Sequence, residues 1–123
     1  MGILYIFSKV QIRSFFSLVP FEVVAMSAYL IVDITIHDPA RYQDYVSQVP
    51  ALIKKHQGTY LVRGGEVEIK EGNWRPNRVI VLEFPTRAQA NDFLEDSDYQ
   101  TLAAIRHAAT TSNAILVEGY KAP

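Results

Sequence analysis

Hydrophobic and polar residues alternate from Ala28 to Ile36, and this period of two predicts a β-strand. One face of the expected strand is fully apolar and consists of Ala28, Leu30, Val32, Ile34 and Ile36. The other face is mixed and consists of Tyr29, Ile31, Asp33 and Thr35. Because a strand with one apolar face must bury that face, we expect helices to pack against it.

The next segment changes to apolar spacings of three and four, which predict an amphipathic helix. Asp38 suits the N-cap, Pro39 suits the first helical position, and Gly58 marks the end. The apolar stripe consists of Tyr42, Tyr45, Val46, Val49, Leu52 and Ile53. Pro50 removes one backbone hydrogen bond inside this helix, so we expect a bend or break there.

The second half of the chain predicts a hairpin and then a helical region. Residues 59–69 and 78–84 are expected to form antiparallel strands around the polar turn "KEGNWRPN". Pro85 ends the second strand, and Thr86 with Gln89 has the spacing of a capping box. Ser97 with Gln100 repeats that spacing before a second helix, and "NAILVEGY" predicts the last strand.

The predicted element order is β-α-β-β-α-β, which favours one architecture. Right-handed crossovers place four antiparallel strands in the spatial order 4-1-3-2 with the helices on one face, a ferredoxin-like α+β fold. The opposite sheet face is expected to carry Ile31, Val79, Val81 and Leu116. These side chains are too apolar to remain in water, so we expect two copies to pack sheet against sheet as a symmetric homodimer.

A chain of 123 residues is long enough for one globular domain, which we place at residues 26–123. Residues 1–25 are apolar, but Lys9, Arg13, Pro20 and Glu22 divide them into runs too short to span a membrane. Three interpretations of this segment remain open: a leader before a start at Met26, a secretion signal, and an amphipathic arm on a partner or a membrane surface.

Composition excludes several classes of function. The 12 basic and 13 acidic residues give a net charge of -1 and no basic block, which argues against a nucleic-acid partner. The absence of cysteine excludes disulfides, cysteine-ligated zinc, iron–sulfur clusters and thiol nucleophiles, and it is typical of a cytoplasmic protein. His37, His56 and His107 show no metal-ligand spacing, so we expect no metal site.

The sequence "RGGE" is the most unusual feature of the predicted hairpin. A phosphate loop places its glycines between a strand and a helix, whereas Gly64 and Gly65 are expected to be followed by more strand. We therefore interpret the glycines as a β-bulge, which would re-aim Arg63 toward a binding site.

Asp33 and Glu83 fall on the same predicted sheet face and on neighbouring strands, where we expect them to converge with Arg63. An ion-pair network is the simpler interpretation. A catalytic role is the alternative, with Glu83 as the first candidate for a general base and Asp33 as the second.

Tyr99 and Arg106 are separated by two helical turns and are expected to share a helix face. They are candidates for holding an anionic group of a substrate, although helix capping or interface pairing would place the same residues there. Trp74 in the polar turn is interpreted as an interface anchor.

The stretch "YLVRGGEVEIKEGNWRPNRVIVLEFPTRAQANDF", with "SDYQTLAAIR" and "LVEGY", resembles the bacterial domain-of-unknown-function family thirteen-thirty. That family lies within the dimeric α/β-barrel superfamily, and the resemblance extends from about Ala28 to Tyr120. It implies a ferredoxin-like subunit that dimerises, and it implies no particular reaction. Superfamily relatives include small monooxygenases, haem-degrading enzymes and muconolactone-isomerase-like proteins, but kinship of fold does not transfer an activity.

Two hypotheses about function follow. The first is an enzyme or binding protein for a small anionic organic molecule, working without a cofactor, with Arg63, Gly64, Gly65, Tyr99 and Arg106 in the binding site. The second is a non-catalytic dimeric interaction module whose polar residues are structural.

Overall fold

The computed structural model describes residues 26–122; residues 1–25, with the three interpretations given above, lie outside the described part. Its strands are β4 (Ala28–Ile36), β5 (Thr59–Arg63), β6 (Arg78–Phe84) and β7 (Thr110–Glu118). Its helices are α2 (Pro39–Val46), α3 (Val49–Lys55), α4 (Arg87–Glu95) and α5 (Ser97–Ala109). This succession confirms the predicted β-α-β-β-α-β order, with both helical regions divided in two.

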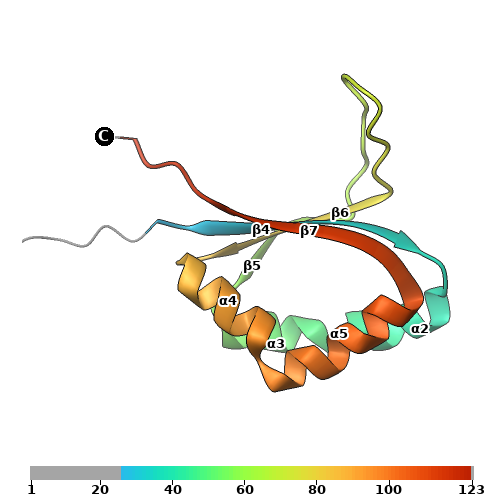
Figure 1. Cartoon of the computed structure of the whole chain (residues 1–123), viewed down its shortest axis with the longest axis horizontal. Coiled ribbons are helices and arrows are strands. Elements are labelled where there is room, and N and C mark those ends of the chain that lie inside the picture. Colours follow the sequence, from blue (N-terminus) through green and yellow to red (C-terminus); the bar gives the residue numbers. More distant parts are fainter. Residues whose placement is uncertain (1–25, 123) are drawn as a thin grey trace, which may run out of the picture.

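The strands form one antiparallel sheet in the order β5-β6-β4-β7, which is the predicted order 4-1-3-2 read from its other edge. β4 is central and pairs with β6 on one side and with β7 on the other. Figure 1 shows all four helices on one side of this sheet, while the loop between β5 and β6 projects from the other side. Among the described helices, none is long and apolar enough to cross a membrane.

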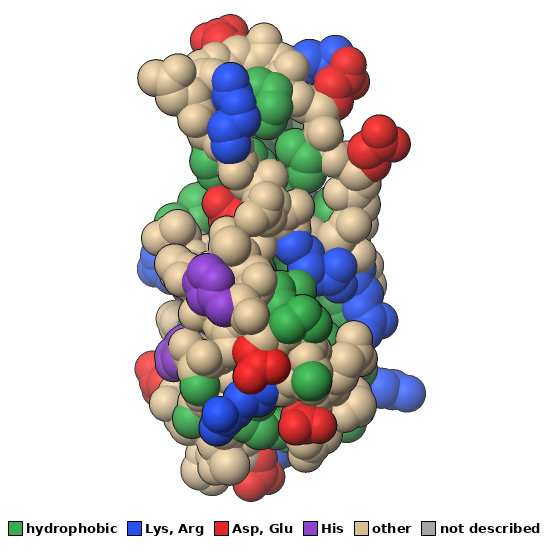
Figure 2. Space-filling model, turned by 90° about the vertical axis from the view of Figure 1, so that its right-hand side faces the viewer, with side chains coloured by type: hydrophobic (Ala, Val, Ile, Leu, Met, Phe, Trp, Pro, Cys, Tyr) green, Lys and Arg blue, Asp and Glu red, His purple; other side chains and the backbone are tan. Residues whose placement is uncertain are grey.

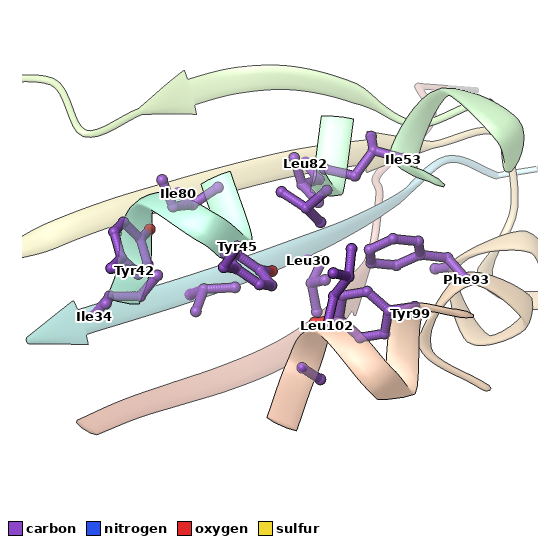
Figure 3. Packing of buried hydrophobic residues seen from close by; sticks show 14 of the residues in the cluster. Leu30, Ile34, Tyr42, Tyr45, Ile53, Ile80, Leu82, Phe93, Tyr99 and Leu102 are labelled. Atoms are coloured by element: carbon purple, nitrogen blue, oxygen red, sulfur yellow. The ribbon is translucent and has the colours of Figure 1, made fainter. Parts of the chain in front are cut away.

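The alternation of β4 sends its apolar residues toward the helices, a side that we call the covered face. Leu30, Val32 and Ile34 are buried there, together with Ile80 and Leu82 of β6. They pack against helix residues that include Tyr42, Tyr45, Ile53, Phe93, Tyr99 and Leu102 (Figure 3). The predicted apolar face of β4 is therefore the floor of the core.

The other side of the sheet, the open face, carries Ile31, Val79 and Val81 as expected. The placement of Leu116 there is wrong, because Leu116 pairs with Leu30 and shares the covered face. Residues 115–117 are all apolar, so their alternation alone could not show which one turns inward. The register with β4 places Ile115 and Val117 on the open face.

The first helical region breaks ahead of Pro50, as the proline predicted. α2 ends at Val46, Ser47 and Gln48 separate the helices, and α3 begins at Val49 with Pro50 in its first turn. The missing N–H of a proline costs nothing in a first turn, where that donor has no partner inside the helix. Two short helices can therefore follow the twisted sheet where one straight helix could not.

The first strand of the hairpin is shorter than predicted. β5 ends at Arg63, and the chain leaves the sheet at Gly64, which has a φ of 73°. The glycines are therefore not followed by more strand, and residues 64–77 form the projecting loop. A β-bulge does exist, but the pairing with β6 shifts between Tyr60 and Val62, before the glycines.

Asp96 links two helices of the covered side. The Thr86 cap of α4 is confirmed, but the predicted Ser97 cap is wrong, because Asp96 accepts from the backbone N–H of Asp98 and Tyr99. The same carboxylate lies 2.8 Å from the Lys55 ammonium and from Nε2 of His56, at the end of α3. Asp96 therefore caps α5 and ties it to α3.

We expect Asp96→Ala to lower Tm by several degrees at pH 7, because it removes a helix cap and two charge-assisted contacts. The hydrogen bonds from Lys55, His56 and the Asp98 amide hold the pKa of Asp96 below its usual range. A lowered pKa stabilises the fold above pH of about 4, and this stabilisation is lost as the pH falls further. Thermal unfolding from pH 7 to pH 3 should therefore show a smaller acid dependence for the variant than for the wild type.

Ser97→Ala is the matched control, since Ser97 lies one position inside the helix and should change Tm little. Equal losses for the two variants, or an unchanged acid dependence in Asp96→Ala, would contradict the assigned role of Asp96.

Candidate functional site

The expected cluster of Arg63, Asp33 and Glu83 does not form. Asp33 and Glu83 both lie on the open face, but Glu83 pairs with Tyr29. The two carboxylates are therefore offset by four positions along β4, a distance of about 13 Å. Arg63 pairs with Ile80 and lines the covered face, so the sheet lies between it and both carboxylates.

Each carboxylate of the open face has a local partner instead. Glu83 accepts a hydrogen bond of 3.1 Å from the Tyr29 hydroxyl, and this bond raises the pKa of Tyr29. Oδ2 of Asp33 accepts a hydrogen bond of 3.0 Å from the indole N–H of Trp74. Oδ1 of Asp33 is buried without a partner among the described residues. The Trp74 contact fastens the projecting loop to the sheet.

A pocket lies between the sheet and the helices, and we call it the helix-side pocket. Its cavity has a volume of about 60 Å³ and opens to solvent. Its apolar lining includes Leu30, Val32, Ile34, Ile80, Leu82 and Phe93. Its polar lining consists of Tyr42, Tyr45, Tyr60, Tyr99, Arg63, Arg78 and Arg106. The pocket therefore combines an apolar floor with hydroxyl and guanidinium groups.

The helix-side pocket carries uncompensated positive charge. Arg63, Arg78 and Arg106 line it, and no aspartate or glutamate is among the described residues that do so. None of the three arginines forms an ion pair within residues 26–122. Figure 2, seen from the end where β4 stops, shows Lys and Arg side chains beside hydrophobic ones below the projecting loop. Such a pocket favours an anion with an apolar body.

Arg63 and Arg78 lie together at the β5–β6 side of the pocket. The guanidinium carbon of Arg63 lies 4.6 Å from the centre of the Tyr60 ring, so this arginine is held by a cation–π contact. The guanidinium of Arg78 lies against Gly64, where an added Cβ would approach its central carbon to 2.6 Å. Nε of Arg78 is buried without a hydrogen-bond partner among the described residues. This side therefore retains unused donors.

Arg106 occupies the α5–β7 side and is held by its neighbours. Nη1 donates to the Ser112 hydroxyl at 2.6 Å, and Nη2 donates to the Tyr99 hydroxyl at 3.3 Å. The guanidinium carbon lies 5.7 Å from the centre of the Tyr45 ring. The predicted shared helix face of Tyr99 and Arg106 is therefore confirmed, and both residues line the pocket.

The Tyr45 hydroxyl remains protonated near neutral pH. Burial, followed by the proximity of Tyr99, raises the pKa of Tyr45 far above its usual range. Burial acts to lower the pKa of Arg106, but Tyr99 and Tyr45 outweigh that effect and raise it overall. Tyr45 is therefore a hydrogen-bond donor, and Arg106 is a fixed cation.

The histidines do not form a common site. His56 contacts Asp96, and Nε2 of His37 lies 2.6 Å from the Thr111 hydroxyl at the start of β7. Nε2 of His107 lies 3.4 Å from Nη2 of Arg106. Within residues 26–122, no group of three or more histidine, aspartate and glutamate side chains is arranged to hold a metal ion.

Sequence reasoning missed Arg78, Tyr42, Tyr45 and Tyr60 as site residues. Arg78 has the same parity along β6 as Ile80 and Leu82, so the alternation of that strand could have placed it on the covered face. Tyr42 and Tyr45 were interpreted only as part of an apolar stripe, although a buried tyrosine also brings a hydroxyl into the core.

The fold and pocket define a ferredoxin-like α+β domain with a cationic pocket between its sheet and its helices. The chain belongs to the family described as "Domain of unknown function (DUF1330)", whose model matches residues 27–120. This match confirms the family resemblance. No curated protein matches the chain.

Solved structures share this architecture at low sequence identity. A protein of unknown function from Rhodopseudomonas palustris has a TM-score of 0.64 at 15% identity, over 79% of this chain and 85% of that one. SnoaB, a cofactor-independent oxygenase from Streptomyces nogalater, has a TM-score of 0.54 at 14% identity, over 80% and 97% of the two chains. A hypothetical protein from Arabidopsis thaliana has a TM-score of 0.54 at 10% identity, over 80% and 91%. At such identities the likeness establishes the fold alone.

We expect Gly64→Ala to destabilise the protein and to disturb the pocket. Gly64 has a positive φ, and an added Cβ would come within 2.6 Å of the Arg78 guanidinium carbon. Gly65→Ala is the matched control, because a Cβ at Gly65 would meet nothing within 4 Å. Chemical denaturation of both variants should show a loss of about 1 kcal/mol or more for Gly64→Ala alone. A greater loss for Gly65→Ala would contradict the geometry described for this turn.

Proposed function

We propose that the protein binds a small organic anion, such as a carboxylate with an apolar body, in the helix-side pocket. The observation that carries this proposal is the set of three arginines that line an apolar recess without ion-pair partners in the described chain. Guanidinium groups bind carboxylates through charge-assisted and often bidentate hydrogen bonds. The guanidinium groups of Arg63 and Arg78 provide the first contacts for the anion.

The floor of the pocket supports an organic ligand over an inorganic ion. Val32, Ile34 and Ile80 would contact a hydrocarbon body, and burial of apolar surface contributes about 25 cal/mol per Å². A simple hydrated anion would gain nothing from that surface. The aromatic rings of Tyr42 and Tyr45 add contact area at little cost in side-chain entropy.

The arrangement also restricts any cofactor-independent reaction in this pocket. Glu83 and Asp33 lie across the sheet from the bound ligand, so neither carboxylate is our proposed general base for it. The groups placed to move a proton are the hydroxyls of Tyr45 and Tyr99, next to the fixed charge of Arg106. Binding is our primary proposal. In an enzyme, the hydroxyls of Tyr45 and Tyr99 would be the groups that transfer a proton to or from the bound ligand.

We expect Arg78→Gln to weaken binding of a monocarboxylate such as hexanoate by about tenfold or more, because it removes hydrogen bonds to a charged group. Isothermal titration calorimetry of wild type and variant measures this change. Arg63→Gln should also weaken hexanoate binding. Because the Arg63 side chain is exposed, its replacement should not disturb folding, so a loss of affinity would report on binding.

Arg87→Gln is the matched control, since Arg87 is exposed on α4, outside the pocket, with Glu118 at 4.0 Å. Equal affinity of Arg78→Gln and Arg87→Gln for hexanoate would refute the proposed site. An absence of any heat from carboxylates with the wild type would refute the function itself.

A second candidate function, a dimeric interaction module, is supported by the open face. Ile115 is 59% exposed, Val117 43% and Val62 38%, next to the half-buried Ile31 and Val81. These apolar side chains lie between Asp33 and Glu83, which both have local hydrogen-bond partners, so a second copy related by a two-fold axis would bury apolar surface on both sides. Trp74, 62% exposed beside this face, would extend the contact as an interface anchor.

We expect the protein to sediment as a homodimer at micromolar concentration. Ile115→Glu should yield monomers, because it places a charge at the centre of the proposed interface. Ala104→Glu, on the exposed side of α5, is the control and should leave the dimer intact. Monomeric wild type, or dissociation by both variants alike, would exclude the open face as the interface.

A further inference from the structure

The cations of the helix-side pocket fall into two groups on opposite sides of β4. Ile34 of β4 pairs with Arg78 of β6 on one side and with Ser112 of β7 on the other. The Ser112 hydroxyl accepts a hydrogen bond of 2.6 Å from Nη1 of Arg106. Strands lie about 4.8 Å apart, so the backbone positions of Arg78 and Ser112 are separated by about 10 Å across the sheet.

The β5–β6 group, Arg63 and Arg78, has donors to spare. Arg63 makes a cation–π contact with Tyr60 and no hydrogen bond from its guanidinium within the described chain, while Nε of Arg78 is buried without a partner. A guanidinium offers five N–H donors. Two adjacent guanidinium groups can therefore surround one carboxylate.

The α5–β7 group is preorganised around Arg106. The Tyr99 hydroxyl accepts from Arg106 and also lies close to the Tyr45 hydroxyl. The buried Tyr45 hydroxyl stays protonated and lies in the same group. The hydroxyl pair, with a fixed cation beside it, forms a second site for a negatively charged oxygen.

We propose that the natural ligand is a dicarboxylate whose two carboxylates bind the two groups, with its apolar body over Ile34. This inference rests on the proposed function and adds that the bound anion carries two carboxylates. A monocarboxylate would bind one group and leave the other cationic group in an apolar pocket without a counter-charge. Two carboxylates offset most of the three positive charges, and the apolar floor between the groups fits the carbon chain that joins them.

The test compares adipate with hexanoate, which share a six-carbon chain and differ in one carboxylate. We expect wild type to bind adipate about tenfold more tightly than hexanoate, as measured by isothermal titration calorimetry at constant ionic strength. Arg106→Gln should weaken adipate far more than hexanoate and so bring the two affinities together. Arg78→Gln should weaken both ligands.

Tyr45→Phe keeps the aromatic ring and removes the hydroxyl, so it tests the second group even where Arg106→Gln folds poorly. It should weaken adipate several-fold and hexanoate much less, whereas Arg87→Gln should change neither. Equal affinity of wild type for the two ligands would overturn the inference while leaving the proposed function intact. Equal weakening of both ligands by Tyr45→Phe would also overturn it, whereas failure of both ligands to bind wild type would refute the proposed function as well.

Discussion

The pairing of β4 with a strand on each side is the constraint on which the rest of the structure depends. The backbone N–H and C=O groups of β4 form hydrogen bonds with β6 and β7. The registers of both neighbouring strands are therefore set relative to β4. A slip by one residue would turn Leu30, Val32 and Ile34 to the open face and destroy the core. The same register places Arg78 and Ser112 on either side of Ile34. The pairing of the strands therefore sets the positions of the residues that line the pocket.

The chain leaves the sheet at Gly64 because two requirements meet there. The backbone adopts a positive φ, and the Arg78 guanidinium occupies the space that a side chain would need. The glycine therefore ends β5 and lets Arg78 lie over the edge of the pocket. A buried donor without a partner costs about 1–3 kcal/mol, and Nε of Arg78 is such a donor. Unfavourable groups of this kind concentrate at functional sites, where a ligand completes them.

The two proposed roles of the molecule lie on opposite faces of the sheet. The covered face holds the pocket and its cations, whereas the open face holds exposed apolar side chains and the locally paired Glu83 and Asp33. A partner could therefore cover the open face without blocking the ligand site. The ion-pair network expected among Arg63, Asp33 and Glu83 is replaced by separate hydrogen bonds on one side and free cations on the other.

The sequence by itself determined the ferredoxin-like order of elements, the inward face of β4, the break near Pro50 and the Thr86 cap, because each follows from local periodicity or from one residue's backbone chemistry. Only the tertiary structure decided where Leu116 points, where β5 ends and which charges meet. Strand pairing joins residues far apart in the chain, and a shift of one position reverses the face of every side chain. That is why Arg63 and Arg106 were recognised singly, while their common pocket with Arg78 appeared only in three dimensions.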